Sequence, residues 1–225
     1  GRNATSFSLD LSSWDVSNVT DMYRMFYYTG YSAADWSIGN LPSWNPSNVT
    51  DMREMFSYAG YNATSFALDL SSWDASSVTS MESMFYFTGH NAGSFTLNLS
   101  SLNASSVTDM GYMFSDAGYN TSSFALNVSA WDTSSVTDMA DMFCNTGYSA
   151  TTWSIGGLSS WNTSNVTDMN DMFRSAGYKA NSFVFDLSQF LCQKLHEKFQ
   201  VEFLKFQQKD LPKYNYYEHI HCVNF

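Results

Sequence analysis

Short stretches in which every second residue is apolar recur along the chain. In one of them Phe66, Leu68 and Leu70 alternate with small or polar residues, and this period of two predicts a short strand with one buried face. The equivalent triplets elsewhere are Phe7/Leu9/Leu11, Phe95/Leu97/Leu99 and Phe124/Leu126/Val128. Because the alternate positions carry small and polar side chains, we expect the other face of each strand to be open to solvent.

A second apolar spacing follows each strand after a polar turn. Val78, Met81, Met84 and Phe85 stand at positions i, i+3, i+6 and i+7, which predicts one buried face of a short helix. A glycine such as Gly89 follows every segment of this kind and is expected to end the helix in a left-handed C-cap. One unit therefore runs strand, turn, short helix, glycine and loop.

Both spacings belong to one tandem repeat of about 29 residues. The motif V-T-[DS]-M-x-x-M-F returns at steps of 30, 29, 29, 29 and 30 residues. Its copies begin at Val19, Val49, Val78, Val107, Val136 and Val166. A fixed period of this length indicates a solenoid, since one unit cannot bury its apolar face until a neighbour stacks on it. The sequence thus predicts an α/β repeat solenoid with one short parallel strand and one short helix per coil.

The most regular apolar positions are expected in the core. All 12 methionines lie in the M-x-x-M pairs, from Met22/Met25 to Met169/Met172. The tryptophan row Trp14, Trp44, Trp73, Trp131 and Trp161 accepts Leu102 in one copy. Two copies carry an additional residue beside a glycine, after Trp36 and after Trp153, and we interpret it as a β-bulge.

The end of the repeats sets the domain organisation. Residues 1–188 hold six full repeats and a partial seventh, and residues 189–225 form a tail of different composition. Apolar residues in the tail step by four from Leu191 to Phe203, which predicts an amphipathic helix over roughly 190–208 that caps the last open layer of the solenoid. Since the chain opens inside a repeat, we interpret it as a fragment of a longer protein.

Charge and composition narrow the class of protein. Residues 1–188 contain 17 acidic and 5 basic residues, a formal charge of −12, so the repeats are expected to repel nucleic acid. No run of about 18 apolar residues occurs, and we expect no membrane span. Few lysines and many Ser, Thr and Asn residues favour an extracellular setting. N-x-[ST] sequons, the acceptors of N-glycosylation, occur at Asn3, Asn18, Asn48, Asn62, Asn98, Asn103, Asn120, Asn127, Asn162 and Asn165.

The run W-D-V-S-N-V-T-D-M-x-x-M-F, from Trp14 to Phe26, resembles the repeats of BspA-like leucine-rich-repeat surface proteins, as does the run from Trp161 to Phe173. The resemblance covers roughly residues 5–190. It implies a leucine-rich-repeat-like solenoid displayed on cell surfaces, with adhesion to host or neighbouring molecules as the usual role. The units here are several residues longer than the commonest form of that repeat.

The repeats predict no catalytic centre, because they place like residues at every level instead of unlike residues at one place. We expect no cofactor and no metal. The aspartate row Asp21, Asp51, Asp109, Asp138 and Asp168 could hold calcium between coils, but stabilisation of helix N-termini explains it as well. Cys144 is interpreted as an incidental residue. A bridge between Cys192 and Cys222 in the tail is open, since their spacing does not decide it.

Two surface rows are candidates for binding. The first follows the glycine of each repeat and consists of Tyr31, Tyr61, His90, Tyr119, Tyr148 and Tyr178. Exposed tyrosines suit contacts with sugars or proteins, whereas packing against the next coil is the alternative explanation. The second row lies on the outward face of the strands and includes Ser8, Asp10, Asp69, Thr96, Asn98 and Asn127. Its small side chains would leave a flat surface open to an extended partner.

Together these features predict a non-enzymatic binding or adhesion scaffold, secreted or on a cell surface, whose partner is an extracellular protein or carbohydrate. Two alternatives stay open: a flat-surface binder of ice or polysaccharide, and a structural spacer in a longer surface protein. A regular outward threonine on every coil would favour ice, but the outward strand positions vary among Ser, Ala and Thr. An open end of the array could also pair with a second copy.

Overall fold

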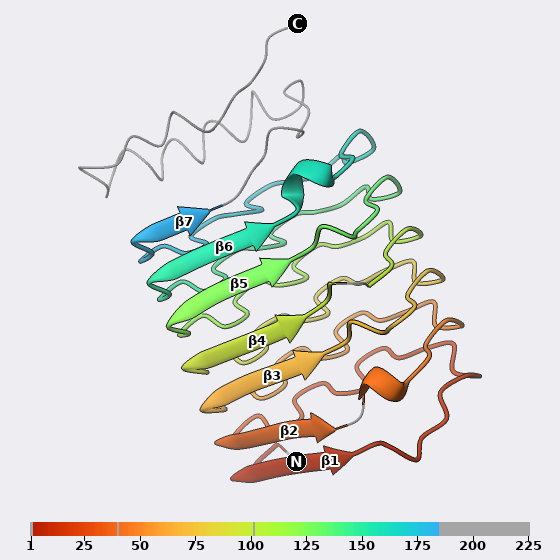
Figure 1. Cartoon of the computed structure of the whole chain (residues 1–225), viewed down its shortest axis with the longest axis vertical. Coiled ribbons are helices and arrows are strands. Elements are labelled where there is room, and N and C mark those ends of the chain that lie inside the picture. Colours follow the sequence, from red (N-terminus) through yellow and green to blue (C-terminus); the bar gives the residue numbers. More distant parts are fainter. Residues whose placement is uncertain (1, 40, 101, 185–225) are drawn as a thin grey trace, which may run out of the picture.

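The computed structural model describes residues 2–39, 41–100 and 102–184. Over this range the chain winds into a parallel β-solenoid with one short strand per coil (Figure 1). The strands are β1 (Ser6–Asp10), β2 (Asp35–Gly39), β3 (Ser65–Asp69), β4 (Ser94–Asn98), β5 (Ser123–Asn127), β6 (Thr152–Gly156) and β7 (Ser182–Val184). The predicted tail, with its capping helix and the Cys192–Cys222 pair, lies outside the described residues.

The strands form where the period of two predicts them, and they pair in parallel. Phe7 is the register partner of Trp36, and Phe66 is the partner of Phe95. Hydrogen-bonded ladders join β1 to β2, β3 to β4, and β5 to β6 and β7. In Figure 1 these strands lie one above another along one face of the solenoid, which we call the strand face.

The prediction of a helix in each coil is wrong, because the M-x-x-M-F segment is a chain of β-turns. The amide of Met25 donates to the carbonyl of Met22 at 3.1 Å. The third residue of that turn, Arg24, has a φ of 56°, the positive value that a type II turn requires. A second turn follows, with Tyr28 at a φ of 57°, and the same pair of positive φ values recurs in every coil.

Stacking explains why a helical spacing produces no helix here. In an α-helix each amide donates to the carbonyl four residues back. In this segment alternate amides donate to the next coil instead, Met22 to Asp51 at 2.9 Å and Phe26 to Met55 at 2.8 Å. Each β-turn returns the chain to the interior after about three residues. The same residues are therefore buried whether the segment forms β-turns or a helix. The neighbouring coil supplies backbone carbonyls as hydrogen-bond acceptors, and these bonds favour the turns over the helix.

The aspartates assigned to helix N-termini start the turn segment instead. Oδ1 of Asp21 accepts the amide of Tyr23 at 2.7 Å, an Asx turn that fixes the local backbone. The same bond forms at Asp51, Asp109, Asp138 and Asp168. Ser80 uses its hydroxyl in the same way, at 3.3 Å. The row therefore has a structural explanation in every coil.

The two longer copies contain a 3₁₀ turn in place of the predicted bulge. The turns η1 (Leu41–Ser43) and η2 (Leu158–Ser160) follow β2 and β6. Gly157 precedes η2 with a φ of 93°, and a Cβ at this position would lie 2.3 Å from Cα of Ser129. The added residue is thus absorbed after the strand, and the strands keep their register.

The core consists of ladders to which each coil contributes one residue. One ladder contains Phe26, Phe56, Phe85, Phe114, Phe143 and Phe173, with successive ring centroids 5.2 to 5.6 Å apart. Methionines of the inner coils, such as Met52 and Met84, have no exposed surface, which confirms the predicted methionine ladder. The tryptophan row is also buried, except for Trp14 in the first coil.

Candidate binding faces

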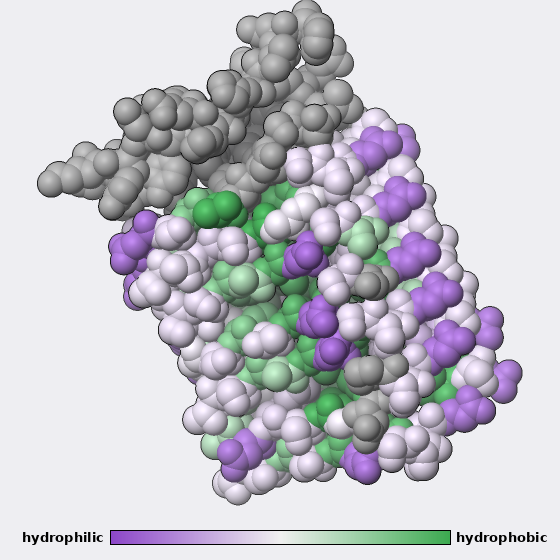
Figure 2. Space-filling view, in the orientation of Figure 1, coloured by the Kyte–Doolittle hydropathy of each residue, from purple (hydrophilic) through white to green (hydrophobic). Residues whose placement is uncertain are grey.

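The outward row of the strand face is flat and mostly exposed. Ser8, Asp10, Asp69, Thr96 and Asn127 are exposed, and Asn98 is half-buried. In Figure 2 this side is pale over much of its area, with hydrophobic atoms visible in a band along its middle and a row of hydrophilic side chains along one edge. Its acidic and amide members complete the turn after the strand: Asp10 and Asn127, for example, accept the amide two residues later. These side chains thus have a structural role beside any contact with a partner.

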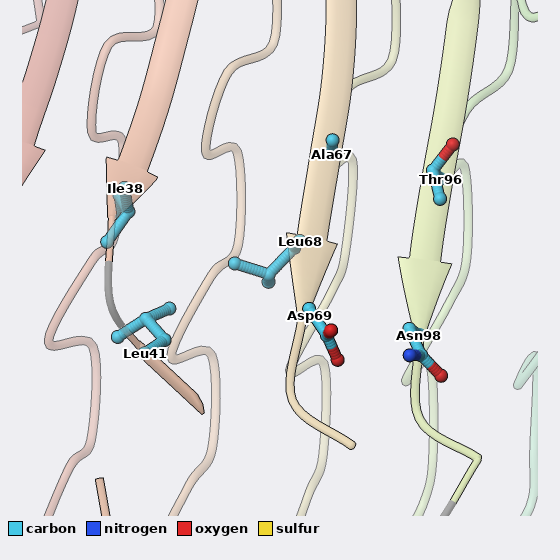
Figure 3. A pocket seen from close by; sticks show the side chains of 7 residues that line it. All are labelled: Ile38, Leu41, Ala67, Leu68, Asp69, Thr96 and Asn98. Carbon is cyan, nitrogen blue, oxygen red and sulfur yellow. The ribbon is translucent and has the colours of Figure 1, made fainter. Parts of the chain in front are cut away.

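Within the described residues, no ladder joins β2 to β3 or β4 to β5. A shallow, open cavity of about 370 Å³ lies beside β2, β3 and β4. Its lining consists of Ile38, Leu41, Ala67, Leu68, Asp69, Thr96 and Asn98 (Figure 3). The cavity brings together three predicted binding residues, Asp69, Thr96 and Asn98.

A regular threonine row does exist, but away from the strands. It consists of Thr20, Thr50, Thr79, Thr108, Thr137 and Thr167, all exposed. Each hydroxyl from Thr50 onward donates to the carbonyl of the threonine one coil earlier, at 3.0 to 3.1 Å. The row therefore reinforces the stacking of the coils. Its sequence signal is the V-T pair of every copy.

The predicted tyrosine row forms one column of stacked rings, which we call the tyrosine column. Successive ring centroids from Tyr31 to Tyr178 are 4.6, 4.8, 4.7, 4.6 and 4.9 Å apart. His90 fits into the column between Tyr61 and Tyr119, and burial lowers its pKa. Because each ring covers the faces of its neighbours, the column turns ring edges outward. The rings of this row thus pack against the next coil, and binding by their outer edges stays a prediction.

Beside the tyrosine column lies a cluster that the sequence analysis did not single out. This aromatic patch consists of Tyr27, Tyr28, Tyr58, Tyr86, Phe87 and Tyr112. Tyr28, Tyr58 and Phe87 stack on one another with centroids 4.4 and 5.0 Å apart. Tyr27 and Tyr86 meet Tyr58 edge to face, at angles of 87° and 88°. The patch is confined to the first four coils.

Four members of the aromatic patch have a backbone conformation that large side chains rarely adopt. Tyr28, Tyr58, Phe87 and Tyr112 have φ values of 57°, 59°, 56° and 56°. This left-handed region favours Gly, Asn and Asp and is strained for a bulky residue. The later coils carry Asp116, Asn145 and Ser175 at the position of Tyr28, and Asp141 and Asp171 at the position of Tyr112. The fold accepts those types, so it does not itself require the aromatic residues. Comparison of the copies at these two positions is the sequence signal that reveals the patch.

Arg24 packs against the aromatic patch in the first coil. The guanidinium of Arg24 lies 4.8 Å from the ring centroids of both Tyr23 and Tyr27. It donates to the two carboxylate oxygens of Glu54 at 3.0 and 2.7 Å. Bidentate pairing of this kind fixes both planar groups in one orientation. The result is a partly exposed surface of tyrosine, arginine and glutamate.

The equivalent surface of the later coils is polar. The carboxylate of Asp116 is 9% exposed and accepts hydrogen bonds from Ser115 and Asn145 at 3.1 and 3.3 Å, and burial raises its pKa. Burial also raises the pKa of Cys144 to about 12, so its thiol stays protonated at neutral pH. In the described ranges no three carboxylate, His or Cys side chains gather in a metal-binding arrangement.

The model of one protein family, described as "Mycoplasma protein of unknown function, DUF285", matches residues 2–56, 30–152 and 91–214. These overlapping matches extend along the tandem repeats and over most of the chain. No curated protein and no solved structure matches, so the likeness to BspA-like proteins stays a resemblance. Within the described part of the chain, no helix is both long enough and apolar enough to span a membrane.

Proposed function

Because the chain belongs to the family described as Mycoplasma protein of unknown function, DUF285, we propose its function from the solenoid itself. It is a non-enzymatic scaffold, secreted or displayed on a cell surface, that binds an extracellular protein or carbohydrate. Repeat solenoids typically offer extended binding surfaces. The extracellular setting rests on the composition, and the adhesive role rests on the resemblance to BspA-like surface repeats.

The strained aromatic residues of the patch carry this proposal. A residue in a sparsely populated backbone region costs on the order of 1–3 kcal/mol, and such residues cluster at functional sites. Tyr28, Tyr58, Phe87 and Tyr112 accept that cost, whereas Asp, Asn or Ser occupies the equivalent positions of the later coils. Tyrosine and arginine are also enriched among residues that dominate binding energy, and Arg24 lies against this surface.

The polar side chains support a non-enzymatic role. Recurring carboxylates such as Asp10, Asp15 and Asp21 each accept the amide two residues later, so they complete turns in coil after coil. Catalysis needs different groups that converge on one reacting atom. The candidate nucleophile of the array, Cys144, is buried.

A triple variant, Tyr28→Asn, Tyr58→Asn and Phe87→Asn, tests the proposal. Asparagine suits the left-handed backbone, so we expect this variant to fold with at least the thermal stability of the wild type. Binding should be measured on an array of glycans and extracellular-matrix proteins. We expect saturable binding by the wild type and its loss in the triple variant. A matched control, Thr79→Ala with Thr108→Ala and Thr137→Ala, changes three exposed residues of the threonine row and should retain binding.

Each outcome has a definite meaning. Binding that survives in the folded triple variant would remove the aromatic patch from the function and direct attention to the strand face. Wild-type protein that binds no arrayed glycan or protein would contradict the binding scaffold and favour a structural spacer.

A further inference from the structure

The geometry of the aromatic patch points to its ligand: we propose that it binds a neutral, extended oligosaccharide that lies along the solenoid axis. This inference rests on the proposed binding function and narrows it to one class of partner. It is drawn from the orientation of the rings, their spacing, the polar groups beside them and the charge of the array.

Two rings of the patch, Tyr27 and Tyr86, stand perpendicular to the stacked rings. Tyr28, Tyr58 and Phe87 stack from coil to coil, so their planes lie across the axis and they cover one another. Tyr27 and Tyr86 are turned by 87° and 88° from the ring of Tyr58, so their planes run along the axis. Sugars pack their C–H groups on aromatic ring faces, and only rings of this second orientation can lie flat against a chain that follows the axis.

The spacing of these two rings suits an extended glycan. Tyr27 and Tyr86 belong to the first and third coils, and parallel strands about 4.8 Å apart separate such positions by roughly 10 Å along the axis. In a flat, extended β-linked glycan every second sugar turns the same face to one side, and two sugars span a comparable length. Between the rings stands Ser57, which is fully buried and whose hydroxyl has no hydrogen-bond partner among the described residues. Neighbouring side chains cover Ser57, so this residue itself offers no surface to a ligand.

Polar groups that could bond sugar hydroxyls lie beside Tyr27. Arg24 lies against Tyr27 and holds both carboxylate oxygens of Glu54, and the hydroxyl of Tyr23 also donates to Glu54, at 3.4 Å. A guanidinium has five N–H donors and a carboxylate has about four acceptor sites, so both groups keep capacity for a ligand. Paired planar donors and acceptors match the vicinal hydroxyl groups of a sugar.

The charge distribution disfavours charged ligands. Positions 1–188 carry a formal charge of −12, which disfavours sulfated glycans and other polyanions. The cations Arg2 and Arg24 lie on the rings of the patch itself, Arg2 at 4.7 Å from the ring centroid of Tyr28, so a cationic ligand gains no advantage there. A neutral ligand is compatible with both the negative charge of the repeats and the arginines beside the patch.

Calorimetric titration with cellohexaose, chitohexaose and xylohexaose tests the inference, with a heparin hexasaccharide as the anionic comparison. We expect at least one neutral hexasaccharide to bind the wild type. In the double variant Tyr27→Ala, Tyr86→Ala its affinity should fall at least about tenfold, as loss of an interface hot spot does. The threonine-row variant should bind as the wild type does. Because truncation of two large residues can impair folding, the conservative variant Tyr27→Trp, Tyr86→Trp is titrated as well and should retain binding.

The outcomes separate this inference from the broader proposal. Patch-dependent binding to a matrix protein, with no binding to any neutral hexasaccharide, would overturn the glycan inference and leave the scaffold function standing. Glycan binding that the folded double variant retains, or a preference for heparin, would also overturn it. If the wild type binds neither glycans nor proteins, both proposals fail.

Discussion

Asp10, Asp15 and Asp21 of the first coil show how single residues are used in this protein. Each carboxylate accepts the backbone amide two residues later, and so completes a turn that the surrounding backbone leaves without an acceptor. Polar residues that recur in every copy are therefore explained by the path of the chain. Positions where the copies differ, such as Phe87 and Asp116, are the more informative ones for binding.

Asp116→Asn is expected to stabilise the protein at neutral pH. Burial raises the pKa of Asp116 in the folded state, so the charged form costs stability, and that cost appears as pH rises from the unfolded pKa of about 3.9 toward the folded value. Asparagine removes the charge, suits the φ of 61° and can still accept the bond from Asn145. We expect a gain on the order of 1 kcal/mol, or about 2–4 °C in Tm, at pH 7. Thermal melts of both proteins between pH 3.5 and 8 provide the measurement.

The sign of the pH dependence is the check on this prediction. The difference in Tm between variant and wild type should shrink as pH falls and the wild-type carboxyl becomes protonated. A difference that stays constant across the range would show that the charge of Asp116 is not its source.

At the scale of elements, the turn segment depends on close approach between coils. Its closing glycines combine a positive φ with contact against the aromatic ladder under the strands. At Gly89, with a φ of 54°, an added Cβ would lie 2.8 Å from Cβ of Phe66. Large side chains pack over these positions because no Cβ is present there.

Gly89→Ala should therefore be strongly destabilising. The left-handed backbone costs an alanine roughly 1–2 kcal/mol, and the added methyl group overpacks the contact with Phe66 by about another 1–3 kcal/mol. We expect Tm to fall by roughly 6–12 °C. Gly111→Ala is the matched control, since the nearest atom to its added Cβ is 3.4 Å away and Ala140 already occupies the equivalent position in the next coil. Equal effects of the two substitutions would contradict the argument.

At the scale of the whole molecule, stability comes from contacts between neighbouring coils. The ladders of core phenylalanine, tyrosine and threonine side chains link each coil to the ones beside it. In such an array each repeat contributes its own stability and two interfaces. The unit that can be gained or lost without disturbing the rest is therefore one complete coil.

Deletion of residues 78–106, which is one 29-residue step of the motif, should leave a shorter solenoid that folds. The deletion joins Ser77 to Val107 and restores the sequence of an ordinary copy. Circular dichroism should show retained β structure, with a lower Tm because one interface is lost. Deletion of residues 78–91, about half a coil, breaks the register of every ladder and should prevent folding. A folded half-coil deletion, or an unfolded full-coil deletion, would contradict the modular architecture.

The sequence by itself determined the period, the strands, their parallel pairing and the buried methionine and tryptophan ladders. These features are encoded inside one repeat by apolar alternation, and repetition turns them into a solenoid. Tertiary structure alone decided that the segment after Val78 forms turns. The spacing of Met81, Met84 and Phe85 suits a helix face and turn corners equally, and the choice depends on carbonyl acceptors that only the neighbouring coil supplies. The strain of the aromatic patch was also decided by tertiary structure, because the left-handed φ of Tyr28 and Tyr58 belongs to turns that the helical spacing did not predict.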